Sequence, residues 1–200
     1  MTMAANGESV GKSPGEDQLI VDQIVSGRKE MFRILVQRYE QAVYGMGLSF
    51  FRNPEDAADF VQEVFLKSFR SLGGFQGRAR FSTWLYRIAY NTGVNSIRRQ
   101  KDYRSLAGDG ETDFIGESPD GETPERLLLR AAAAEVVREA MKGLPERYRI
   151  CVDLFFFYDR SYQEIELITG YPVNTIKSHV FRAKKLLREK LEGIVEGGIE

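Results

Sequence analysis

The chain has 200 residues, with 28 Lys and Arg against 29 Asp and Glu, so its formal net charge is −1. This length allows one domain or two small ones, and a hydrophobic fraction of 42% supplies modest cores rather than one large one. Cys151 is the only cysteine and His179 the only histidine, which excludes a disulfide framework and a Cys/His zinc site. We expect no metal and no cofactor.

Nothing in the sequence predicts membrane insertion. The longest apolar run, Leu154 to Tyr158, is far shorter than the roughly 20 residues of a membrane-spanning helix. Residues 1–16 have no apolar segment after a basic start, so they predict a disordered tail and not a signal peptide. A lone cysteine is typical of a reducing compartment. We therefore expect a soluble cytoplasmic protein.

Helical spacing of apolar residues runs through the first half of the chain, with almost no strand signal. Asn53 and Pro54 mark a helix start, because an Asn cap and a Pro in the first turn both suit that position. The segment 75–80 is expected to be a loop. Helices are expected at about 17–27, 29–51, 53–72 and 82–101.

An acidic segment at 105–125 divides the chain. It carries seven acids and no Lys or Arg, with several Gly among them, a composition that cannot bury enough apolar surface to order itself. The sequence therefore predicts an all-α protein with two small helical domains on a flexible acidic linker. The expected divisions are a tail at 1–16, a first domain at 17–102, the linker at 103–123, a second domain at 124–193 and a tail at 194–200.

The second domain contains the pattern of a helix-turn-helix. A helix is expected at 124–142 and a break at 143–145, followed by three further helices. Ser161 and Glu164 form a capping box, and the helix they open ends near Gly170, which tolerates a left-handed conformation. Another helix is expected to begin near Asn174.

This last helix has an apolar stripe and a basic face. At 100° per residue the stripe contains Ile176, Val180, Ala183, Leu187 and Leu191. The opposite face carries cations, small polar groups and one aromatic side chain: Asn174, Lys177, Ser178, Phe181, Arg182, Lys185 and Arg188. Such a face suits a major-groove reader, with Phe181 against a thymine methyl group or the backbone. The alternative is an amphipathic helix with a solvated face.

The first domain carries two further candidate surfaces. On the helix after Asn53, an acidic face with one exposed Leu favours a basic protein partner over a merely solvated face: Asp59, Gln62, Glu63 and Leu66. The loop at 75–81 (FQGRARF) suits a pocket for an unstacked base beside phosphates, although Phe75 and Phe81 could instead anchor the loop. We expect Trp84 to be a core residue.

Two segments in each half resemble a known family. DAADFVQEVFLKSFRSL (56–72) and FSTWLYRIAYNTGVNSIRR (81–99) resemble the second conserved domain of bacterial sigma factors of the extracytoplasmic-function group. LPERYRICVDLFFFYDRSYQEI (144–165) and GYPVNTIKSHVFRAKKLL (170–187) resemble their fourth domain. The resemblance covers about 17–102 and 124–192, in the family's order and with no third domain between.

The resemblance implies a promoter-specificity subunit and not an enzyme. In this family the first domain docks on the β′ clamp coiled coil of core RNA polymerase, here through Asp59, Gln62, Glu63 and Leu66. The fourth domain sits on the β flap, and the linker follows the RNA exit channel. An anti-sigma factor, often anchored in the inner membrane, is the expected regulator.

The family's DNA contacts can also be carried onto this sequence. Contact with the minus-10 element, including capture of an extruded base, is expected from Phe75, Arg78, Arg80, Phe81, Arg87, Asn91, Asn95, Arg98 and Arg99. Contact with the minus-35 element is expected from Asn174, Lys177, Ser178, His179, Phe181, Arg182 and Lys185. His179 stands where Arg is frequent and Asn174 where Gly is common, so an unusual minus-35 preference is expected.

Other classes of protein remain as alternatives. A stand-alone helix-turn-helix regulator would bind a symmetric operator without polymerase. A helical adaptor would leave the basic face of the last helix unexplained. An enzyme is least favoured, since Cys151 sits among apolar neighbours and His179 lies on the basic helix.

Overall fold

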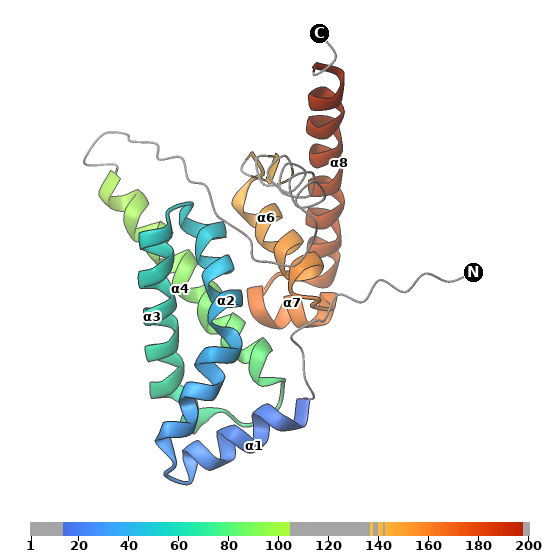
Figure 1. Cartoon of the computed structure of the whole chain (residues 1–200). Coiled ribbons are helices and arrows are strands. Elements are labelled where there is room, and N and C mark those ends of the chain that lie inside the picture. The colour runs from blue at the N-terminus through green and yellow to red at the C-terminus, as the bar shows by residue number, and fades with distance from the viewer. Residues whose placement is uncertain (1–13, 105–136, 138–139, 142, 198–200) are drawn as a thin grey trace, which may run out of the picture.

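The computed structural model describes residues 14–104, 137, 140–141 and 143–197, and all regular elements in these ranges are helical (Figure 1). The N-terminal unit contains α1 (Pro14–Val25), η1 (Lys29–Met31), α2 (Phe32–Phe51), α3 (Pro54–Ser71), η2 (Leu72–Gly74) and α4 (Phe81–Arg104). The C-terminal unit contains α6 (Glu146–Val152), η3 (Asp153–Phe157), α7 (Tyr162–Thr169) and α8 (Val173–Gly197). Most of the helix expected at 124–142 and most of the linker lie outside the described residues.

Three helix boundaries differ from the sequence expectation. Helix α1 begins at Pro14, so residues 14–16 are not part of the tail, and Glu16 and Asp17 favour the positive end of its dipole. Helices α4 and α8 run on to Arg104 and Gly197, past the expected domain ends at 102 and 193. Once a helix is formed, each further residue adds a hydrogen bond at little cost, so composition alone places its end poorly.

The expected capping signals are confirmed. The Asn53 side chain accepts a hydrogen bond of 2.8 Å from the amide of Glu55, with Pro54 at the first position of α3. Ser161 and Glu164 form the reciprocal capping box of α7. The Glu164 amide donates a hydrogen bond of 3.2 Å to the Ser161 hydroxyl, and the Ser161 amide donates one of 3.0 Å to the Glu164 carboxylate. Gly170 ends α7 with a φ of +76°. These local interactions set the directions of α3 and α7.

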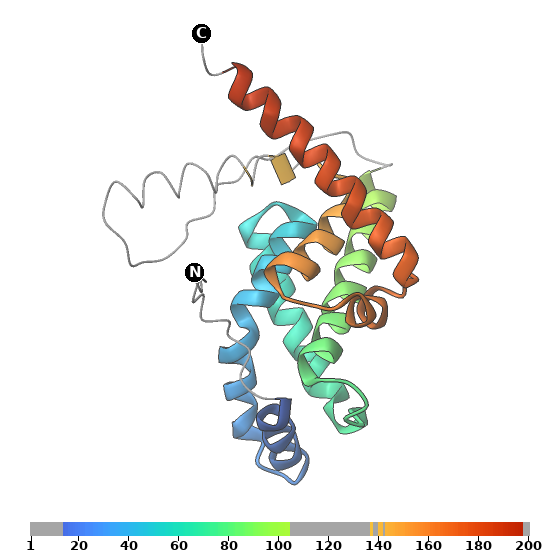
Figure 2. The ribbon, with the colours of Figure 1, turned by 90° about the vertical axis from the view of Figure 1, so that its right-hand side faces the viewer.

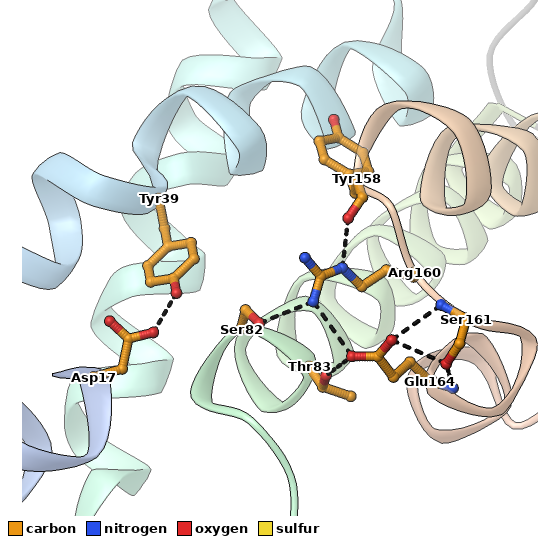
Figure 3. Close-up of polar contacts among 8 residues, drawn as sticks. All are labelled: Asp17, Tyr39, Ser82, Thr83, Tyr158, Arg160, Ser161 and Glu164. Atoms are coloured by element: carbon orange, nitrogen blue, oxygen red, sulfur yellow. Dashed lines mark hydrogen bonds and ion pairs between the residues drawn. The ribbon is translucent and has the colours of Figure 1, made fainter. Parts of the chain in front are cut away.

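The N-terminal unit is a helical bundle in which α2 packs on α3 and α4, with α1 across one end (Figures 1 and 2). Fully buried Leu35, Val64 and Leu85 fill its centre. Asp17 is buried and anchors α1, accepting a hydrogen bond from the Tyr39 hydroxyl (Figure 3) and another from Arg38. Trp84, which was expected in the core, is half-buried and packs against it.

The two units do not stand apart, because they share one hydrophobic core. Helix α7 lies against α4, and α6 lies against α2 (Figure 2). Buried residues of both units form one continuous cluster, with Leu85 and Tyr90 on one side and Leu154, Ile165 and Ile168 on the other. Periodicity predicts which face of a helix is apolar, but not which element covers that face. The two expected helical domains therefore lie in direct contact, which the sequence did not predict.

Candidate nucleic-acid and polymerase interfaces

The basic face expected on the last helix lies on the surface of α8. Phe181 is 70% exposed, and the other expected members of this face are exposed as well: Asn174, Lys177, Ser178, Arg182, Lys185 and Arg188. On the opposite side Ile176, Val180 and Ala183 are buried. The helix therefore packs its apolar side on the protein and presents its cations and one aromatic ring to solvent.

Helix α7 holds the start of α8 by polar contacts. A Glu166 carboxylate oxygen accepts a hydrogen bond of 3.2 Å from the Val173 amide, at the first turn of α8. The Thr169 hydroxyl accepts one of 3.2 Å from the Tyr171 amide within the connecting turn. The sequence analysis missed Glu166, because a carboxylate seven residues before a helix gives no local capping signal. These bonds orient the exposed face of α8.

His179 is corrected from a surface residue to a core residue. It is only 9% exposed, and its ring centroid lies 5.0 Å from that of Tyr148 and 5.4 Å from that of Tyr171. Burial, and then the nearby Arg147 and Arg182, lower the pKa of His179 and favour the neutral ring. Position 179 is three residues after Ile176, so helical spacing puts it on the apolar stripe.

The expected contact of Phe81 with minus-10 DNA is also corrected, because the Phe81 side chain is only 3% exposed. Its ring lies 5.9 Å from Phe75, 5.6 Å from Tyr39 and 5.6 Å from Trp84, centroid to centroid. Aromatic packing of this kind anchors the end of the 75–80 loop on the bundle, which was the structural alternative for this residue. Phe75 is half-buried, while Arg78 and Arg80 of the same loop are exposed.

A shallow groove of about 360 Å³ runs between α3 and α4. It is lined by Lys67, Arg70, Ser71, Ile88, Asn91, Thr92 and Asn95. Of the expected minus-10 residues, Asn91 and Asn95 line the groove, and Arg87, Arg98 and Arg99 are also exposed on α4. The sequence analysis did not name Lys67 and Arg70 as candidate DNA-binding residues, although two cations three residues apart lie on the same face of a helix.

The groove combines cations with amide and hydroxyl groups. Lys67 donates a hydrogen bond of 3.2 Å to the Thr92 hydroxyl and pairs with Glu63 at 2.6 Å. Cations follow a phosphate backbone, and Asn side chains can both donate to and accept from a base edge. The groove therefore has the chemistry of a single-strand binding surface.

The expected polymerase-binding face of α3 is a separate surface. Asp59 and Gln62 are exposed, and Leu66 is 56% exposed beside them. Glu63 is half-buried and bonded to Lys67. An exposed apolar side chain among acids is typical of a protein contact with a basic partner.

A helical bundle with a polar groove, joined to a helix-turn-helix with an exposed basic face, defines a two-part nucleic-acid-binding protein. The comparison with known families is specific. Residues 35–103 match the model for sigma-70 region 2, and residues 134–187 match that for sigma-70 region 4.

Curated relatives match along 90% of the chain. The RNA polymerase sigma-H factor of Pseudomonas aeruginosa is 36% identical over 90% of this chain and 96% of its own. The ECF RNA polymerase sigma-E factor of Haemophilus influenzae is 35% identical over 90% of this chain and 97% of its own. The chain belongs to the sigma-70 family of RNA polymerase sigma factors, in the extracytoplasmic-function group.

Solved structures share the fold. The sigma factor RpoE of Bartonella quintana, in complex with the anti-sigma factor NepR, has a TM-score of 0.67 at 21% identity, covering 80% of this chain and 96% of that one. CnrH, in complex with the cytosolic domain of CnrY, has a TM-score of 0.63 at 22% identity, covering 88% and 97%. Among the described residues, no helix has the length and apolar character that crossing a membrane requires.

Proposed function

We propose that this sigma factor directs core RNA polymerase to promoters by placing its two units on two DNA elements. The observation that carries the proposal is the match of both sigma-70 regions in one chain, each region bearing an exposed cationic surface. It acts by binding and has no catalytic step of its own. The alternative of a stand-alone helix-turn-helix regulator is not favoured, because such a regulator would not be expected to contain sigma-70 region 2.

The minus-10 element is assigned to the groove between α3 and α4 and to the loop that follows α3. Lys67, Arg70 and Arg87 would follow the backbone of the non-template strand, and Asn91 and Asn95 would contact base edges. Unstacking a base costs a few kcal/mol, so these contacts must offset that cost to favour strand opening. Arg78 and Arg80 would add phosphate contacts from the loop.

The minus-35 element is assigned to the exposed face of α8. Arg182 and Lys177 would contact guanine or phosphate, and Phe181 would contact an apolar group such as a thymine methyl. Asn174 and Ser178 stand on the same face, with Lys185 one turn further on. His179 is left out of this set because its side chain is buried.

Two polymerase contacts complete the proposal. The α3 face of Asp59, Gln62, Glu63 and Leu66 would bind the coiled coil of the β′ clamp, since it combines acids with an exposed Leu. The C-terminal unit would rest on the β flap, and the chain between the units would follow the RNA exit channel. Both contacts rest on the family resemblance.

An anti-sigma factor is the proposed regulator. One solved structure that shares this fold, the sigma factor RpoE of Bartonella quintana, is a complex with the anti-sigma factor NepR. A membrane-anchored regulator would hold this protein at the inner membrane. If the purified protein bound lipid vesicles in the absence of such a regulator, the proposal that the regulator holds it at the membrane would be contradicted.

Run-off transcription tests the proposed function. Purified protein is mixed with bacterial core polymerase and a promoter pool, and the transcripts are sequenced. Discrete start sites that require the protein, and that weaken with Arg182→Ala or Asn91→Ala, are expected. Binding to a symmetric duplex by the free protein, without stimulation of transcription, would instead support the stand-alone regulator.

A further inference from the structure

The contacts between the two units are specific, and they converge on the segment just before α7 (Figure 3). Arg160 donates a hydrogen bond of 3.1 Å to the Ser82 hydroxyl at the start of α4, and its guanidinium lies 5.6 Å from the Tyr86 ring. The Thr83 hydroxyl donates a bond of 3.2 Å to Glu164 of the capping box. Further along, the Ser49 hydroxyl donates to buried Asp153.

Tyr158 occupies a notch in α2 made by a glycine. A Cβ built on Gly45 would lie 2.6 Å from the Tyr158 hydroxyl oxygen and 3.8 Å from its Cζ, and it would meet no other atom within 4 Å. The Tyr158 ring also packs on Tyr86 of α4, at 5.5 Å between centroids. Gly45 is therefore the position where a single methyl group would disturb the contact between the units and nothing else.

Among the described residues, a buried cation with two unpaired nitrogen atoms lies on α6, the helix that contacts α2. Arg149 is 6% exposed, and its Nε and Nη1 atoms are buried with no hydrogen-bond partner in the part of the chain that the structure describes. A buried donor without a hydrogen-bond partner costs free energy. The contacts of Tyr158 and Arg160 are those that join the units most specifically.

The closed arrangement cannot occupy both promoter elements at once. Positions −35 and −10 differ by about 25 base pairs, which span roughly 85 Å at about 3.4 Å per base pair. Two compact units of fewer than about 100 residues in direct contact have centres only about 30 Å apart. The units must therefore part before both DNA-binding surfaces reach their elements.

We propose that the packed state is an autoinhibited resting form of the protein, latched by Tyr158 in the Gly45 notch and by Arg160 on α4. Autoinhibition in this sense rests on the proposed function, whereas the latch itself does not. The proposed DNA-binding surfaces are already exposed in the packed state. Opening the latch therefore uncovers neither of them, but it frees the two units to separate to the promoter spacing.

Gly45→Ala is the direct test. Alanine suits a helix better than glycine, so the N-terminal unit should not be weakened, while the new methyl group forces Tyr158 out of the notch. Dyes are placed on cysteines introduced at Ser26 and Gln163, which are exposed and outside the proposed binding surfaces. Cys151 is fully buried and should not react with the dyes. Single-molecule energy transfer then reports the distance between the units.

We expect Gly45→Ala to raise the ratio of open to closed molecules about tenfold or more, the scale of one overpacked methyl group. Adding Tyr158→Phe removes the atom 2.6 Å from the new Cβ and should restore closure. Gly15→Ala, on a helical glycine with no atom within 4 Å of its Cβ position, is the matched control and should change nothing.

Two results would overturn the proposal. An unchanged distance distribution in Gly45→Ala would show that the notch does not hold the units together in solution. An open Gly45→Ala variant that binds core polymerase and starts transcription no faster than the native protein at limiting concentration would show that closure is not inhibitory. If none of the variants supports transcription, the proposed function fails, but the distance measurements still decide the latch.

Discussion

Asp153 is a buried carboxyl group that faces the other unit of the protein. Burial raises the pKa of Asp153 to about 6, against the opposing effects of the Ser49 hydrogen bond and of Arg149. The charged groups around it are Arg149 on its own helix and, beyond Arg149, Arg52 at the end of α2; Tyr158 is the nearby neutral titratable group. A carboxyl group in such a site titrates nearer to neutral pH than an exposed one.

This pKa predicts a pH effect on stability. Because the folded-state pKa lies above the unfolded value of about 3.9, the charged group opposes folding above pH 6, and the effect vanishes below about pH 4. From pH 7.5 to pH 5.0, the native protein should gain roughly 1 kcal/mol of unfolding free energy relative to Asp153→Asn. Urea unfolding of both proteins at the two pH values measures the difference. A constant difference would mean that Asp153 titrates normally.

Phe181 and His179, two residues apart on α8, should respond differently to truncation. Phe181→Ala should leave the unfolding free energy within about 0.5 kcal/mol of the native value, because the ring is 70% exposed, but should weaken minus-35 recognition. His179→Ala should lower the unfolding free energy by about 1–3 kcal/mol, since it removes a packed ring. Urea titration and promoter binding by the reconstituted holoenzyme separate the two effects. Equal losses of stability would contradict the corrected placement of His179.

At the scale of single helices, Asn53 stabilises the start of α3, which carries the proposed polymerase-binding face. Replacing Asn53 by Ala removes the 2.8 Å bond to the Glu55 amide and should lower the unfolding free energy by about 1 kcal/mol. Gln62→Ala, on the exposed side of the same helix, should be nearly neutral for stability. Thermal and urea unfolding check both variants, and equal effects would argue against the cap as the cause.

The groove between α3 and α4 depends on the packing of two helices, and Arg70 tests its function. Arg70 is exposed at the end of α3 and lines the groove, whereas Lys67 is also paired with Glu63. Arg70→Ala should weaken promoter binding by the holoenzyme about equally for different sequences and reduce the salt slope by about 1. Arg33→Ala, an exposed cation on α2, is the control. A loss confined to one promoter sequence would point to base reading instead.

For the whole molecule, the shared core predicts coupled unfolding. Trp84 is the only tryptophan and reports on the N-terminal unit, while far-ultraviolet circular dichroism reports on both units. The two signals should give coincident urea curves in the native protein and separate curves in Gly45→Ala. Separate curves in the native protein would show that the interface contributes little to stability.

Much of the local structure could be predicted because its causes are local. The Asn53 cap, the Ser161 capping box and the Gly170 terminator involve neighbours within a few residues, so sequence shows them directly. The exposed basic face of α8 also followed from helical spacing. Phe81 and His179 were misplaced because the family resemblance was given more weight than that same spacing, which puts both side chains toward the core.

Composition and periodicity were enough to establish the helical class and the exposed basic face of α8, because each depends on contacts within one helix or one turn. The two sigma-70 regions were recognised from the resemblance of whole sequence segments to the family. Only the tertiary structure decided that α7 covers α4, that Tyr158 fills the notch at Gly45, and that Lys67 and Arg70 join the groove with Asn91 and Asn95. These contacts join residues about 20 to more than 100 positions apart. An apolar stripe requires a covering partner, and a one-dimensional pattern does not specify which partner that is.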